Sequence, residues 1–119
     1  MHLTQRDFET LVEEALAELP SEFADLLDNI AIVVEEEPTA DDLEALEDEG
    51  GELLGLYRGI ARTHRTFDMM PTLPDQIAIF RGPILRVARG RRDAVEEIRD
   101  TVIHELGHYF GLHDDEMIF

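Results

Sequence analysis

Apolar residues in the first part of the chain recur with the spacing of a helix. Five of them follow the pattern i, i+3, i+4, i+7, i+8, namely Phe8, Leu11, Val12, Ala15 and Leu16. Thr4 stands before this run with a side-chain oxygen suited to an N-cap, and Pro20 ends it. The pattern predicts a helix between Thr4 and Pro20. Ser21 is then expected to begin a short second helix with Phe23, Leu26 and Leu27 inward.

Short apolar runs in the middle of the chain predict three strands. Ile30–Val34 is β-branched and is expected to form a buried strand. Leu53–Gly59 predicts a second strand, in which Gly55 is the expected position of a bulge. Gln76–Phe80 predicts a third strand.

The segments between and after these strands are polar or contain turn residues. Residues 35–51 are acidic and contain a proline, so we expect a solvated loop with a short helix at 40–47. Residues 60–75 predict a long loop that carries Arg62, His64 and Arg65. The pair Gly82-Pro83 predicts a turn, and residues 84–88 predict either an extended piece or a short helix.

A longer helix is predicted near the C-terminus. Its apolar stripe consists of Val95, Ile98, Val102, Leu106 and Tyr109. Asp93 with Glu96 resembles a capping box at its start, and the helix is expected to run to about Phe110. The order of elements predicts one α+β domain over residues 1–119, in which a small mixed sheet packs against helices and this long helix is C-terminal.

Charge is distributed unevenly over the 119 residues, whose formal net charge is −18. Residues 1–57 hold 18 acidic side chains and only Arg6, whereas residues 58–119 hold ten acidic side chains and nine arginines. This balance argues against nucleic acid and anionic membranes as partners. It would attract a basic peptide or protein, although an acidic solubilising surface is the commoner meaning of such a bias. We expect a cytoplasmic protein, because no signal peptide or membrane-spanning run is visible.

The candidate chemistry lies in the C-terminal helix, in the sequence His104-Glu105-Leu106-Gly107-His108. Histidines four residues apart lie one turn apart on one face of a helix, where both imidazoles can bind a single Zn²⁺. Glu105 is placed to accept a proton from a metal-activated water. The plain alternative is two solvated surface histidines. With no cysteine in the chain, a metal must use histidine and carboxylate ligands.

A third ligand is expected just beyond the helix. Gly111 can adopt a positive φ and turn the chain, so that Asp114 returns towards the metal. His113 is the neighbouring alternative. Three protein ligands and one water are typical of a catalytic zinc site, whereas a structural site fills all four positions with protein.

The chain resembles a family of small bacterial zincin-like proteins that end in a motif of the form H-E-x-G-H-x-F-G-x-x-D. The segments LLGLYRG, LPDQIAIFRGPI and TVIHELGHYFGLHDDEM carry the resemblance. It implies a minimal zincin-like fold and favours Asp114 over His113 as the third ligand. In zincins a strand upstream of the metal helix pairs with an extended peptide, and the resemblance makes Gln76–Phe80 the candidate strand.

The sequence therefore predicts a zinc-dependent metallopeptidase-like hydrolase of peptide bonds. Its metal ligands would be His104, His108 and Asp114, and Glu105 would be the general base. Two alternatives keep the metal but lack turnover: an interaction module that holds a basic protein or peptide, and a purely structural metal site.

Overall fold

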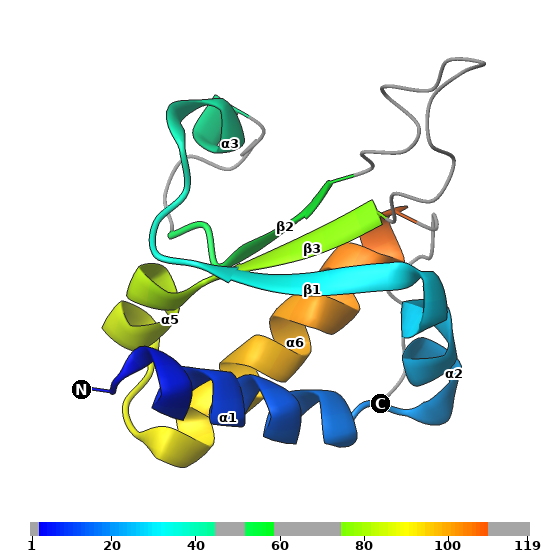
Figure 1. Ribbon diagram of the computed structural model, residues 1–119, viewed down its shortest axis with the longest axis horizontal. Helices are drawn as coiled ribbons and strands as arrows, with labels where there is room; N and C mark the ends of the chain where they lie inside the picture. Colours follow the sequence, from blue (N-terminus) through cyan, green and yellow to red (C-terminus); the bar gives the residue numbers. More distant parts are fainter. Residues whose placement is uncertain (1–2, 45–51, 59–74, 110–119) are drawn as a thin grey trace.

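The computed structural model describes residues 3–44, 52–58 and 75–109, without the side chains of Glu44, His108 and Tyr109. Its elements are α1 (Gln5–Ala17), α2 (Ser21–Ala24), the 3-10 helix η1 (Asp25–Asn29), β1 (Ile30–Glu35), α3 (Ala40–Glu44), β2 (Gly55–Arg58), β3 (Asp75–Phe80), α5 (Arg81–Val87) and α6 (Arg91–Tyr109). The strands form a mixed sheet of order β1-β3-β2. Helices α1 and α6 lie together against one face of this sheet, and α3 stands beyond the other (Figure 1). The predicted α+β architecture is confirmed.

The N-terminal helices form as their sequence pattern predicts. Thr4 caps α1, because its hydroxyl oxygen accepts a hydrogen bond from the Asp7 N–H at 3.1 Å. Four residues of the predicted apolar stripe are buried, namely Phe8, Leu11, Val12 and Ala15. Helix α2 also begins at Ser21 as expected and buries Phe23, but it gives way to the 3-10 helix η1 after Ala24.

The three strands are found where they were predicted, but their places in the sheet differ from expectation. Strand β3 is central, parallel to β1 and antiparallel to β2, and its last four residues are buried. Every residue of β1 is half-buried, because β1 is an edge strand, so the expectation of a fully buried strand there is wrong. The expectation that Gln76–Phe80 pairs with a peptide is also wrong, because β1 and β2 occupy both of its edges.

Gly55 marks a close crossing between strand and helix rather than the expected bulge. The register from Gly55 opposite Ile79 to Arg58 opposite Gln76 is unbroken. A Cβ atom added at Gly55 would lie 2.5 Å from Cγ2 of Thr101 and 2.9 Å from the carbonyl oxygen of Ala78. Glycine is therefore what lets α6 lie this close to β2.

The turn expected at Gly82-Pro83 is the first turn of α5, which begins directly after β3. Proline fits there because the first backbone N–H groups of a helix have no partner within it. The Gly82 N–H donates to the Glu36 carbonyl oxygen at 2.9 Å, so the chain after β1 crosses over this turn. Residues 84–88 are accordingly helical through Val87, which settles the two alternatives left open for them.

Helix α6 buries the four residues of the predicted stripe whose side chains the structure describes. Val95, Ile98, Val102 and Leu106 are each at most 1% exposed, and they form one core with α1 and the sheet. The helix begins at Arg91, two residues before the expected cap. Asp93 lies in the first turn of the helix, where its carboxylate accepts a hydrogen bond from the Arg89 N–H at 2.8 Å. No helix among the described residues is long and apolar enough to cross a membrane.

In its described residues, the acidic segment after β1 is not the solvated loop that was expected. The predicted short helix is present as α3, and the side chain of its Asp42 is buried. Arg58 of β2 donates to Asp42 at 2.9 Å and to both carboxylate oxygens of Glu35, and its guanidinium lies over the ring of Phe80. The nearby ion pairs Arg81–Glu36 and Arg86–Glu37 also tie this segment to α5.

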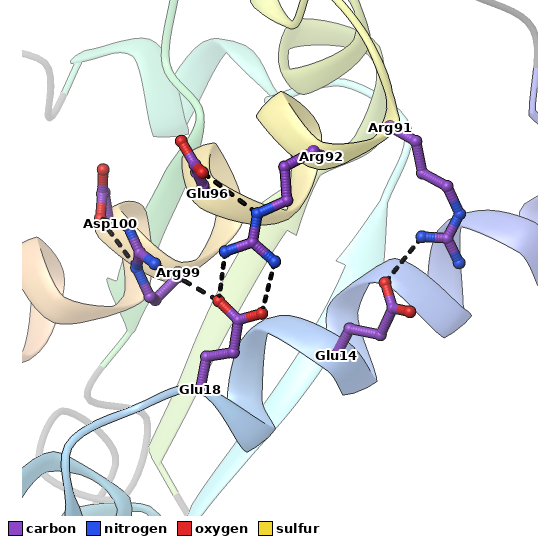
Figure 2. Close-up of polar contacts among 7 residues, drawn as sticks. All are labelled: Glu14, Glu18, Arg91, Arg92, Glu96, Arg99 and Asp100. Atoms are coloured by element: carbon purple, nitrogen blue, oxygen red, sulfur yellow. Dashed lines mark hydrogen bonds and ion pairs between the residues drawn. The ribbon is translucent and has the colours of Figure 1, made fainter.

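The uneven charge distribution has a structural counterpart. Among the described residues, six arginines of the second half form ion pairs with acidic side chains of the first half (the arginines are Arg58, Arg81, Arg86, Arg91, Arg92 and Arg99). Figure 2 shows the group between α1 and α6, where Arg92 and Arg99 both reach Glu18 and Arg91 reaches Glu14. Part of the acidic excess of the first half is thus neutralised within the fold.

Candidate metal and catalytic site

The predicted motif lies in the last turns of α6, beside the edge strand β2. The side chain of His104 is exposed, and Glu105 is half-buried. The helix continues without a break to Tyr109, so His108 follows His104 by one helical turn on the same face. The predicted separation of the apolar stripe from the histidine face is therefore confirmed for the helix backbone and for His104.

Glu105 is held by the backbone of β2. Its Oε1 accepts a hydrogen bond from the Tyr57 N–H at 3.0 Å. The Phe80 N–H donates to the Leu54 carbonyl oxygen, and the register then places Leu56 and Arg58 at positions that bond to β3. In an antiparallel pair the alternate residue points its N–H away from the partner strand, so the Tyr57 N–H faces outward. Glu105 thus takes the outward donor of an edge strand.

Tyr57 is itself fixed from a second direction. Its phenolic O–H donates to Oδ2 of Asp75, the first residue of β3, at 2.9 Å. The other carboxylate oxygen of Asp75 is buried and has no hydrogen-bond partner among the described residues. Sequence reasoning singled out neither residue. The available signal was their location in the two segments LLGLYRG and LPDQIAIFRGPI, which carry the family resemblance outside the metal helix.

Among the described residues, the carboxylates of α6 differ in their partners. Glu96 and Asp100 each pair with an arginine on the same helix, and Asp93 bonds to a backbone N–H. Glu105 forms no ion pair with an arginine in the described part of the chain, and its hydrogen-bond donor there is an uncharged amide. An amide orients a carboxylate through one hydrogen bond and adds no full positive charge beside it.

Glu97 lies two turns before Glu105 and also has a distinct electrostatic environment. Partial burial raises the pKa of its carboxyl group, and the nearby charges of Asp93, Asp100 and Glu96 raise it further. Its backbone carbonyl accepts a hydrogen bond from the Thr101 hydroxyl at 2.7 Å. This side of α6 is therefore rich in negative charge between the ion-paired start of the helix and the histidines.

Part of the predicted ligand set lies outside the described residues. These are the side chain of His108, the expected third ligand Asp114 and its alternative His113. His64, of the loop predicted over residues 60–75, also lies outside them. Within the described part of the chain, no group of three potential ligand side chains could hold a metal ion. The assignment of His104, His108 and Asp114 as ligands stays a prediction.

An open depression lies at the opposite end of α6. It is lined by Ala17, Val95 and the charged residues Glu14, Glu18, Arg91 and Arg92. These charged side chains are already joined in ion pairs with one another. The depression is separate from the histidine motif and offers no group suited to hydrolysis.

Comparison with known proteins relates the chain to a protein family and to a protein of known structure. A model of the zincin-like metallopeptidase family matches residues 27–118. The structure of a conserved hypothetical protein from Thermus thermophilus is similar, with a TM-score of 0.58 and 27% sequence identity. That match covers 91% of this chain and 94% of the other. No curated protein sequence matches.

Proposed function

Because the chain belongs to the family of zincin-like metallopeptidases, we propose that it is a zinc-dependent hydrolase of peptide bonds. His104, His108 and Asp114 would hold the metal, and Glu105 would act as the general base. The observation that carries the proposal is the placement of Glu105. Its carboxylate is half-buried beside the histidine face of α6 and is oriented by a backbone amide of the edge strand.

The residues present fit a zinc ion by their chemistry. His104 is exposed on the helix, so its imidazole is accessible to a metal, and the helical backbone places His108 one turn away. Two imidazoles and one carboxylate form a donor set that zinc accepts, with a position left for water. Bound zinc supplies Lewis-acid activation of the attacking water and of the scissile carbonyl.

Glu105 performs the proton transfers in this proposal. One of its oxygens is held by the Tyr57 N–H, and the other remains to accept a proton from the attacking water. The protonated carboxyl group then returns that proton to the leaving amine as the peptide bond breaks. The water oxygen ends in the new carboxylate and the proton on the new amine, so the hydrolysis balances without any further reactant.

The substrate is proposed to lie along β2 rather than β3. β2 is an edge of the sheet, and because Glu105 takes the outward Tyr57 N–H, the outward-facing backbone of Gly55 is the part of this edge proposed to meet the peptide. An extended peptide can add to such an edge through main-chain hydrogen bonds. A basic peptide is favoured by the net charge of −18, because an acidic protein attracts a cationic chain.

Glu105→Gln tests the hydrolase proposal. The amide is similar in size but cannot accept the proton, so turnover should fall by about 10²–10⁴-fold while zinc remains bound. Turnover is measured on substrates selected from a peptide library, and zinc content by mass spectrometry. Glu97→Gln is the matched control on the same helix and should keep both turnover and zinc.

The result also separates the alternatives. Wild-type activity that survives Glu105→Gln would remove the general-base role. Absence of wild-type turnover on the whole library, with zinc bound, would instead favour the interaction module that holds a basic partner. No observation on the described residues favours that module over the hydrolase.

A further inference from the structure

We propose that Tyr57 is a positioning residue for Glu105. In this inference the backbone N–H of Tyr57 sets the orientation of the Glu105 carboxylate, and the bond from its phenol to Asp75 sets the position of that N–H. The inference deepens the proposed hydrolase function and rests on it for its catalytic consequence. The structural link itself can be tested without any activity.

The first step concerns the freedom of the glutamate side chain. A glutamate on a helix surface has several rotatable bonds and samples many rotamers. The 3.0 Å hydrogen bond to Tyr57 selects the rotamers that bring Oε1 to β2 and leave Oε2 on the other side of the carboxyl group. A base held in one geometry reacts faster than one that must find it, because proton transfer requires hydrogen-bond distance and alignment.

The second step concerns the donor. β2 has only four residues and bonds to a neighbouring strand on one side, and short edge strands of this kind are weakly held. A displacement of β2 would carry the Tyr57 N–H away from Glu105. The phenol prevents this, because it reaches along the core face of the sheet to Oδ2 of Asp75 at 2.9 Å.

The third step concerns the cost of that arrangement. Oδ1 of Asp75 is buried without a hydrogen-bond partner among the described residues, which is unfavourable for a carboxylate. An apolar side chain at position 75 would avoid this cost. The charged carboxylate is, however, a stronger acceptor for the phenol than a neutral one. The feature is therefore better suited to fixing Tyr57 than to stabilising the fold.

The other face of β2 is also secured, one residue further along. Arg58 donates from this strand to Glu35 of β1 and to Asp42 of α3. β2 is thus tied through Tyr57 on the face towards α6 and through Arg58 on the face towards α3. The hydrogen bonds of Arg58 anchor the strand to β1 and α3, whereas those of Tyr57 reach Glu105 and Asp75.

The first experiment measures amide hydrogen exchange by NMR on the full-length protein. Glu105→Ala removes the acceptor, so exchange at the Tyr57 amide should accelerate by about 10-fold or more, since that N–H points away from the β3 ladder. Tyr57→Phe and Asp75→Asn should accelerate exchange at residue 57 by a smaller factor. The Leu56 amide, which points towards β3, is the internal control and should change little. Unchanged exchange at residue 57 in Glu105→Ala would overturn the proposal.

The second experiment measures steady-state kinetics of the zinc-loaded protein on a peptide cleaved by the wild type. Tyr57→Phe should lower kcat by about 10-fold, because it loosens the base, and should leave KM within about twofold and zinc content unchanged. Asp75→Asn should have the same effect in a weaker form. Asp100→Asn, an exposed carboxylate paired with Arg99, is the matched control and should leave kcat unchanged.

The two experiments separate failure of this inference from failure of the proposed function. Accelerated exchange of the Tyr57 amide, with no wild-type turnover, would support the Tyr57–Glu105 link and contradict the hydrolase proposal. Normal wild-type turnover with an unchanged kcat in Tyr57→Phe would support the hydrolase proposal and contradict the positioning role of Tyr57. A rise in KM instead of a fall in kcat would assign Tyr57 to substrate binding and would also overturn it.

Discussion

The two halves of α6 bury the same apolar stripe but use their polar side chains differently. In the first half, Arg91, Arg92 and Arg99 face acidic residues of α1 and its C-cap in exposed ion pairs (Figure 2). In the second half, Thr101 packs against the position of Gly55, and Glu105 bonds to the backbone of β2. One helix therefore joins a solvated charge network at its start to a close contact with an edge strand at its end.

The difference separates interactions that hold the helix from those that place a reactive group. Exposed ion pairs are screened by water and salt and add little to stability, and Glu18 is shared by two arginines, so either can be lost. The Glu105–Tyr57 bond has no such substitute among the described residues. We infer that the first half of α6 tolerates substitution of its polar residues and that the second half does not.

The largest expected stability effect is common to both halves. Ile98→Ala and Leu106→Ala each remove a fully buried side chain from the same core, so each should lower the free energy of unfolding by about 2–5 kcal/mol. Chemical denaturation measures both values. A much smaller loss of unfolding free energy in Leu106→Ala than in Ile98→Ala would mean that the apolar stripe is not continuous. The two halves of α6 would then not share one buried face.

Gly55→Ala is expected to disturb the packing of the second half of α6 and not that of the first half. The added methyl group would collide with Thr101 and with the Ala78 carbonyl oxygen, so the free energy of unfolding should fall by about 1–3 kcal/mol. Thr101→Ser removes the colliding methyl group and keeps the hydroxyl that bonds to Glu97. Combined with Gly55→Ala, it should recover part of the loss in thermal denaturation. If the double variant recovers no stability, the strain arises at the Ala78 carbonyl oxygen instead.

Glu97→Gln should raise stability by less than about 0.5 kcal/mol at neutral pH. Partial burial and three acidic neighbours raise the pKa of this carboxyl group in the folded protein, so its charged form destabilises the fold. That penalty is present above the raised pKa and disappears as the pH falls below the ordinary value of 4.5. Denaturation of both proteins across this range checks the sign. A gain that grew towards low pH would contradict it.

Arg92→Ala should have the smallest effect. Arg92 is exposed, and Arg99 can still pair with Glu18, so the thermal midpoint should remain nearly unchanged at physiological salt. The pKa of Glu18, which the hydrogen bond from Arg92 lowers most, should rise towards its ordinary value in an NMR titration. A large loss of stability would show that the charge network holds α1 to α6, and the two halves would then differ less than we infer.

The sequence by itself determined the elements, because their signals are local. Thr4 and Pro20 bound α1, β-branched runs form β1 and β3, and a 3.6-residue stripe forms α6. The H-E-x-x-H spacing likewise determined that both histidines share one helical face, since that follows from helix geometry alone. These features require no knowledge of what lies opposite each residue.

Only the tertiary structure decided what those elements face. The order β1-β3-β2 made the expected peptide-binding strand central and left β2 at the edge, and a strand pattern carries no information about its neighbours. The same packing showed that Gly55 admits a helix and that Tyr57 holds Glu105. Such contacts join residues nearly fifty positions apart, and their partners are set by how the whole chain packs, which no local pattern encodes.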